Sequence, residues 1–139
     1  MTFPAIILWK PGLSVGVAAI DEDHKQLVKM INRLFGASLS LDPARVVTAV
    51  LDELTVYVRA HLDREEAYMR HYDYPGFQQH QQEHQRLLEA VGRFRRNLEL
   101  GLTMNLKEEI ERSLRDWLVS HIQGHDRRLG QFLNQQGIY

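Results

Sequence analysis

The chain has 139 residues, of which 44% are apolar, and its 17 basic side chains are nearly balanced by 18 acidic ones. A chain of this length fits one domain with a sizeable core, and its charge argues against nucleic acid or an anionic membrane as a partner. The absence of cysteine excludes disulfides, iron–sulfur clusters and thiolate metal sites, so any metal must be bound through nitrogen and oxygen.

Residues 1–19 predict an irregular arm that packs onto the rest of the domain. Prolines and glycines interrupt this segment at Pro4, Pro11, Gly12 and Gly16. The apolar run Phe3–Trp9 has no basic residue ahead of it and is followed by Lys10, which makes it a poor signal peptide. No later run approaches the length of a membrane span. We therefore expect a soluble cytoplasmic protein, with Trp9 of the arm against the core.

The first predicted helix runs from Asp21, the expected N-cap, to about Ser40. Its apolar stripe recurs at three- and four-residue intervals through Leu27, Met30, Ile31, Leu34 and Phe35. Asp42 and Pro43 then supply an N-cap and a first-turn proline, and helical periodicity continues to about His71. The chain thus begins its folded part with two amphipathic helices joined by a short turn.

A third helix is predicted from Phe77 to Leu100. The sequence Tyr74-Pro75-Gly76 marks a turn before it, and Gly101 is a typical C-terminal stop signal.

A fourth helix is predicted from Asn105 to about Asn134. Asn105 followed by Glu108 resembles a capping box. Gly124 and Gly130 are the points at which this long helix could break.

Four long amphipathic segments joined by short turns, with no strand pattern, predict an all-α fold. The expected architecture is an up-down-up-down four-helix bundle over residues 20–139, preceded by the arm of residues 1–19, in a single domain.

Every predicted helix carries at least one histidine. In chain order the seven are His24, His61, His71, His80, His84, His121 and His125. Residues four apart lie roughly 40° from each other around a helix axis, so His61 and Glu65 project from one face. His80 and His84 share a face for the same reason, and His24 falls on the apolar stripe of its helix. Each i,i+4 pair could chelate a metal.

The histidines indicate a metal site weakly when each is considered alone and more strongly when they are considered as a set. A lone histidine such as His24 or His71 is more often an exposed or hydrogen-bonded residue than a ligand, and one i,i+4 pair is a weak signal. The coincidence of inward histidines on all four helices is stronger, because burying them without metal is costly unless each finds a partner. The set therefore predicts a metal site inside the bundle.

The sequence does not decide which residue of the fourth helix is the second metal ligand beside His121. His121 and His125 are four residues apart and could chelate together, whereas His121 and Asp126 diverge by roughly 140° on an ideal α-helix. Spacing alone slightly favours His125.

The order and spacing of these groups resemble the iron-ligand pattern of the hemerythrin family. The pattern here is His24, His61-x-x-x-Glu65, His80-x-x-x-His84 and His121-x-x-x-x-Asp126. The likeness extends along nearly the whole chain, to Trp9, Ile20-Asp21, the run from Glu65-Glu66 to Met69, Tyr74-Pro75-Gly76, and Asp116 to Ile122. These segments look like those of single-domain bacterial hemerythrins.

The resemblance implies two iron ions joined by an oxo or hydroxo bridge and by the carboxylates of Glu65 and Asp126. One iron takes three histidines and the other takes two: His80, His84 and His121 for the first, His24 and His61 for the second. The second iron keeps an open position for O2. This assignment places His125 behind the ligands or on the surface, and it requires the fourth helix to bend or Asp126 to reach sideways.

Residues beside the ligands predict an apolar O2 pocket. They are Leu27, Leu62, Trp117, Leu118 and Ile122. None brings a titratable group near bound O2, although ordinary core packing would explain them equally. One departure from the family is Leu129, which stands where many hemerythrins carry a tyrosine three residues after the bridging aspartate. Any role of that hydroxyl is absent from this chain.

We therefore expect reversible O2 binding, for storage, transport or delivery, rather than catalysis. The ligand types would also suit zinc or manganese, and the choice of iron follows from the resemblance. Di-iron oxygenases use four acidic ligands and two histidines, and the anionic ligands stabilise the high-valent iron that forms when the O–O bond is cleaved. Five neutral imidazoles stabilise such iron less well, so this ligand set favours holding O2 over activating it. Three alternatives remain: a nitric oxide reductase or peroxidase on the same centre, an O2 or redox sensor, and a metal-buffering role. The enzyme would need an unidentified electron donor and the sensor an output partner, whereas a carrier would serve an O2-consuming partner.

Overall fold

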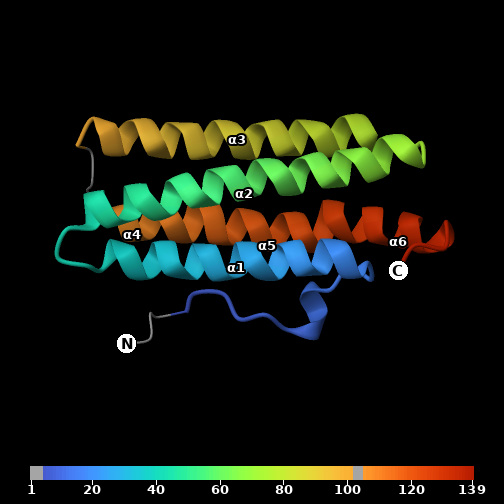
Figure 1. The fold of residues 1–139 in the computed structure, drawn as a ribbon, viewed down its shortest axis with the longest axis horizontal. Coiled ribbons are helices and arrows are strands. Elements are labelled where there is room, and N and C mark those ends of the chain that lie inside the picture. Colours follow the sequence, from blue (N-terminus) through green and yellow to red (C-terminus); the bar gives the residue numbers. More distant parts are fainter. Residues whose placement is uncertain (1–4, 102–104) are drawn as a thin grey trace.

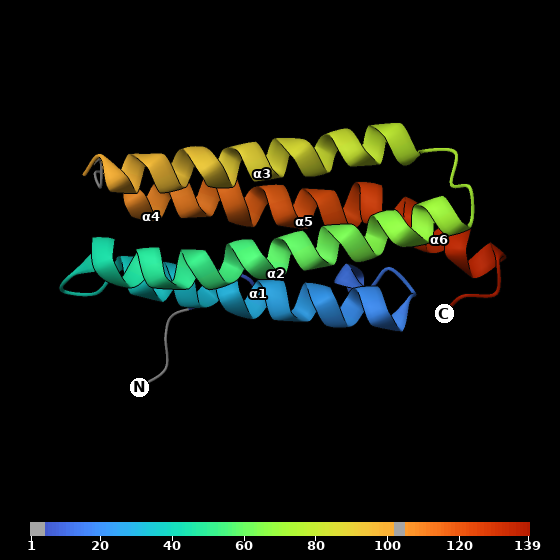
Figure 2. The same cartoon turned by 45° about the horizontal axis from the view of Figure 1, so that its top comes forward.

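Four long helical segments, each antiparallel to the one before it, make up the computed structural model, which describes residues 5–101 and 105–139 (Figure 1 and Figure 2). The first three are α1 (Ala18–Ser38), α2 (Pro43–His71) and α3 (Phe77–Glu99). The fourth consists of consecutive pieces: α4 (Leu106–Glu109), η2 (Ile110–Asp116), α5 (Trp117–His121), η3 (Ile122–Asp126) and α6 (Arg127–Gln135). The described residues contain no strand, and the predicted four-helix bundle is confirmed.

The start of α1 differs from the prediction. Asp21 is not the N-cap, because the helix already begins at Ala18 with Val17 in the cap position. The Asp21 carboxylate instead accepts hydrogen bonds from the Ser14 hydroxyl (2.5 Å) and the Val15 amide (2.8 Å). A residue that looked like a helix start therefore fastens the preceding arm to the first turn.

The other helix ends lie close to their predicted positions. Asp42 occupies the N-cap position of α2, as expected, but its side chain makes no cap hydrogen bond. Asn105 precedes α4 with a left-handed backbone (φ 61°) and makes no side-chain cap bond, so the expected capping box is not formed. The fourth segment continues through Gly124 and Gly130, so neither glycine breaks it.

The arm lies along the outside of the bundle beside α1 (Figure 1). Residues 1–4 of the predicted arm lie outside the described residues. The Asn32 side-chain oxygen accepts hydrogen bonds from the amides of Ile6 and Ile7, both at 3.0 Å. Its amide nitrogen donates in return to the Ile7 carbonyl (3.0 Å). Trp9 is partly buried against the core, as predicted.

The arm also touches α6 at a point where only glycine fits. A Cβ atom on Gly130 would lie 2.0 Å from the carbonyl oxygen of Val15. Beside this contact, the Asn134 side chain donates to the Gly16 carbonyl at 2.9 Å. The arm and the end of the fourth segment are therefore packed backbone to backbone.

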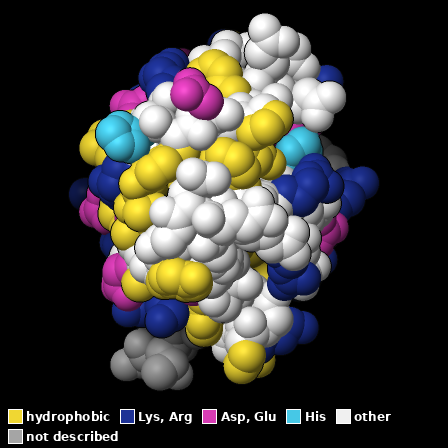
Figure 3. All heavy atoms as spheres, turned by 90° about the vertical axis from the view of Figure 1, so that its right-hand side faces the viewer, with side chains coloured by type: hydrophobic (Ala, Val, Ile, Leu, Met, Phe, Trp, Pro, Cys, Tyr) yellow, Lys and Arg dark blue, Asp and Glu magenta, His cyan; other side chains and the backbone are white. Residues whose placement is uncertain are grey.

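The interior has two halves along the bundle axis. Toward the α1–α2 turn it is apolar, and its fully buried members include Leu34, Leu51, Leu54 and Ile110. Toward the α2–α3 turn, buried polar side chains from all four segments occupy the centre. A view onto that end shows apolar and uncharged atoms over the middle of the face, with Lys and Arg side chains at its margins (Figure 3). We call the region toward the α1–α2 turn the apolar half and the region toward the α2–α3 turn the polar half.

Among the described residues, none of the helices combines the length and the apolar character of a membrane span.

Candidate metal centre

Seven polar side chains meet in the polar half. They are His24 of α1, His61 and Glu65 of α2, His80 and His84 of α3, His121 of α5 and Asp126 of η3. Each is at most 4% exposed to solvent. The structure thus brings together every residue that the resemblance assigned as an iron ligand.

The ligand atoms of these residues form two overlapping groups. In each group, one nitrogen or oxygen atom per residue lies within 4.8 Å of all the others. The first group is Glu65, His80, His84, His121 and Asp126, and the second is His24, His61, Glu65 and Asp126. Both groups share the same two carboxylates. Each group could therefore hold a metal ion.

Asp126 turns one oxygen toward each group. Its Oδ1 lies 2.8 Å from Nε2 of His80 and 3.0 Å from Nε2 of His121. Its Oδ2 lies 2.9 Å from Nε2 of His24. The carboxylate therefore stands between the two groups.

Glu65 also contacts both groups, here mainly through one oxygen. Its Oε1 lies 2.9 Å from Nε2 of His61 and 3.3 Å from Nε2 of His84. Despite these short distances, all four oxygens of Glu65 and Asp126 lack a well-aligned hydrogen bond within the described chain. The same holds for the Nε2 atoms of four of the histidines: His24, His80, His84 and His121. Buried polar atoms without hydrogen bonds are costly, and cations bound between them would remove that cost. The donor set fits metal ions.

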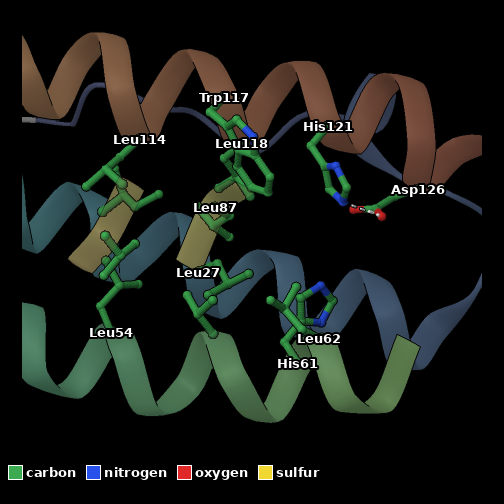
Figure 4. A pocket seen from close by; sticks show the side chains of 13 residues that line it. Leu27, Leu54, His61, Leu62, Leu87, Leu114, Trp117, Leu118, His121 and Asp126 are labelled. Carbon is green, nitrogen blue, oxygen red and sulfur yellow. Dashed lines mark ion pairs between the residues drawn. The ribbon is translucent and has the colours of Figure 1, made fainter. Parts of the chain in front are cut away.

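The local backbone explains how two residues five apart share one face. The segment η3 is π-helical, and its i→i+5 hydrogen bonds bring residues five apart into line. His121 and Asp126 therefore both point inward (Figure 4). His125 lies outside both groups, with its Nδ1 atom 3.2 Å from the Arg128 guanidinium. The spacing argument for His125 assumed an ideal α-helix, which this segment is not.

Without metal, the charges of the site stabilise one another. Burial would lower the pKa of His61, but the Glu65 charge and a hydrogen bond to Asp23 raise it to about 10. Burial would raise the pKa of Asp126, but the charges of His121 and His24 hold it well below its usual value. Metal ions bind unprotonated imidazole nitrogens, so loading the site must release protons from these pairs.

Sequence reasoning missed two charged residues behind His61. The Asp23 carboxylate lies 2.8 Å from His61 Nδ1 and is held by two hydrogen bonds from Arg64. Asp23 comes directly before His24, and Arg64 follows His61 by three residues. In the sequence each reads as an ordinary solvated charge on a helix, and only the contact between α1 and α2 reveals the pair.

An apolar cavity lies against the two groups (Figure 4). Its free volume is about 20 Å³, slightly more than one water molecule needs. Four of the predicted pocket residues line it, namely Leu27, Leu62, Trp117 and Leu118, together with His61, His121 and Asp126 of the metal groups. Ile122 is the exception to the prediction, since it is buried but does not line this cavity. It directly follows His121, and neighbouring residues point about 100° apart around a helix.

A family model, related sequences and a solved structure all match this chain to hemerythrins. Residues 15–133 match the family model described as the hemerythrin HHE cation binding domain. The chain is 30% identical to a bacteriohemerythrin of Stenotrophomonas maltophilia over 88% of this chain and 78% of that protein. It is 29% identical to a bacteriohemerythrin of Methylococcus capsulatus over 94% of this chain and 98% of that protein. A solved structure of wild-type hemerythrin superposes with a TM-score of 0.83 at 27% identity, covering 91% of this chain and 97% of that one.

Proposed function

The chain belongs to the hemerythrin family, and from this premise we propose that it holds two iron ions in its two ligand groups and binds O2 reversibly. The observation that carries the proposal is the overlap of the two groups, which share both Glu65 and Asp126. A single metal ion would need one of the groups and leave the other as unpaired buried donors. The second ion accounts for all seven side chains.

The proposed assignment leaves the two irons unequal. His80, His84 and His121 would hold one ion, and His24 and His61 the other, with an oxo or hydroxo bridge between them. The ion with fewer protein ligands would keep an open position. When both ions are ferrous, each would supply one of the two electrons that reversible O2 binding at such a centre requires.

The cavity supports a role in holding O2. The atoms of His61, His121 and Asp126 form part of its wall, so a small molecule inside it would lie directly beside both groups. Its remaining wall is aliphatic apart from Trp117, and such a wall excludes water and protons from the bound gas. We therefore propose a carrier that stores, transports or delivers O2 in the cytoplasm.

Absorption spectra test this proposal against an enzymatic role. The anaerobically reduced protein is exposed to air, and the gas is then removed. A visible band that appears with O2, disappears on its removal and returns in further cycles supports the carrier. Rapid irreversible oxidation, or catalytic consumption of nitric oxide or peroxide with an added electron donor, would instead support an enzyme.

A further inference from the structure

A charged network lies behind His61, on the side of the ring that faces away from the two ligand groups. Asp23 Oδ2 is 2.8 Å from His61 Nδ1, and Asp23 is only 7% exposed. Arg64 donates from Nε to Oδ2 (2.8 Å) and from its terminal nitrogen to Oδ1 (2.6 Å). The Tyr57 hydroxyl adds a fourth hydrogen bond to this carboxylate at 3.1 Å.

No other histidine of the centre has such a strong support. The Nδ1 atoms of His24, His80 and His121 are buried without a hydrogen-bond partner in the described chain. His84 Nδ1 faces Glu66 at the longer distance of 3.3 Å. His61 is therefore the ligand whose outer nitrogen is bound most tightly, and the partner is an ionised carboxylate.

The charge of Asp23 is secured by its neighbours. Arg64 donates two hydrogen bonds to its carboxylate and Tyr57 donates one, and this pairing with a guanidinium stabilises the ionised form. An ionised carboxylate that accepts a hydrogen bond from Nδ1–H fixes the imidazole tautomer, so that the lone pair of Nε2 faces the metal. It also makes that nitrogen a stronger donor.

We propose that Asp23 and Arg64 are positioning residues that fix the ring of His61 and set its donor strength toward the iron with the open position. The inference rests on the proposed function, since it requires an iron at His24 and His61. The two residues act in opposite senses. Asp23 strengthens the ligand by accepting its Nδ1–H hydrogen bond, and Arg64 limits this effect because it also draws on the charge of the carboxylate.

The test compares Asp23→Asn, Arg64→Gln and the matched control Glu66→Gln, which alters the carboxylate behind His84 of the other group. Each protein is loaded with iron, oxidised to the ferric state and titrated with azide, which is a probe for an open ferric position. Loss of donor strength makes the iron a better electron acceptor, so Asp23→Asn should shift the azide-to-iron band to longer wavelength. Arg64→Gln should shift it to shorter wavelength, and Glu66→Gln should leave it in place.

Iron retention is the second readout. Removing the partner of a metal-bound histidine typically lowers metal affinity by 10- to 100-fold. One of two ferrous ions should therefore be lost to a chelator 10- to 100-fold more readily from Asp23→Asn than from the parent. The Arg64 side chain is 48% exposed, so Arg64→Gln should fold and still carry the test if Asp23→Asn does not load.

The outcomes separate this inference from the function on which it rests. If the parent protein loads fewer than two irons or shows no azide band, the proposed function fails and the inference fails with it. If the parent behaves as proposed but the Asp23 and Arg64 variants shift the band in the same direction, or not at all, only the inference is overturned. A purely structural role would loosen the site in both variants and give shifts of the same sign.

Discussion

The two halves of the bundle interior are equally well buried but differ in what burial does for them. Leu34 and Leu51 of the apolar half gain free energy when they leave water. His24 and Asp126 of the polar half lose it, because their ligand atoms find no well-aligned hydrogen bonds within the described chain. The same four helical segments carry both halves. A helical stripe therefore specifies which residues face inward, while the chemistry of each residue decides whether it stabilises the fold alone or only with a bound cation.

The largest expected effect is loss of the proposed iron from Asp126→Ala. Asp126 belongs to both ligand groups, so its removal should abolish the proposed di-iron centre rather than weaken it. His125→Ala is the matched control, since His125 lies outside both groups, and it should retain two irons per chain. Iron analysis of the purified variants checks this prediction. Two irons in Asp126→Ala and none in His125→Ala would show that the groups are wrongly assigned.

Removal of iron should destabilise the whole fold, through the unpaired side chains of the polar half. A ligand that binds only the folded state at 1,000 times its Kd adds about 4 kcal/mol, so the metal-free protein should melt at a clearly lower temperature. Leu51→Ala removes packing from the apolar half and should cost about 2–5 kcal/mol. That cost should be the same with and without iron, because Leu51 lies away from the site. Thermal unfolding of all four species measures both effects, and an unchanged melting temperature after iron removal would contradict the prediction.

Leu118 lies where the two halves meet, and its truncation should affect both. Leu118→Ala should lower stability by about 2–5 kcal/mol and speed the irreversible oxidation of the oxygenated protein, because the cavity wall would admit water. Leu114 lines the same cavity and is therefore a poor control. Leu34→Ala, in the apolar half, should lose similar stability without faster oxidation. Equal decay of the oxygen-dependent band in both variants would leave Leu118 with a packing role alone.

The smallest effect should come from a contact outside both halves. A Cβ on Gly130 would collide with the Val15 carbonyl, so Gly130→Ala should push the arm outward and cost about 1–3 kcal/mol. Gly92→Ala, on α3, meets only one atom at 3.5 Å and should be neutral or slightly stabilising. Both variants should keep their full iron content. Urea unfolding measures the costs, and equal stability of the two would show that the arm adapts freely.

Helical periodicity was sufficient to predict the fold and most of the inward faces, because buried residues recur at three- and four-residue intervals along α1, α2 and α3. It could not distinguish Asp126 from His125, since that choice depends on a π-helical turn that residue spacing does not encode. It also misassigned Asp21 as a helix cap, because residue type alone does not distinguish a carboxylate that caps a helix from one that binds the preceding arm. The pair of Asp23 and Arg64 was not predicted, because a contact between two helices does not follow from the residue spacing within either helix.

The π-helical turn of η3 is equivalent to one residue inserted into a regular α-helix. Five residues of such a turn carry the chain about as far around and along the axis as four residues of an α-helix. His121 and Asp126 thus occupy the relative position that a His-x-x-x-Asp pair would have without the turn. Among related sequences, a one-residue gap between these two positions would be compatible with an unchanged site. The same gap between His80 and His84, on the regular helix α3, would turn one ligand away from the centre.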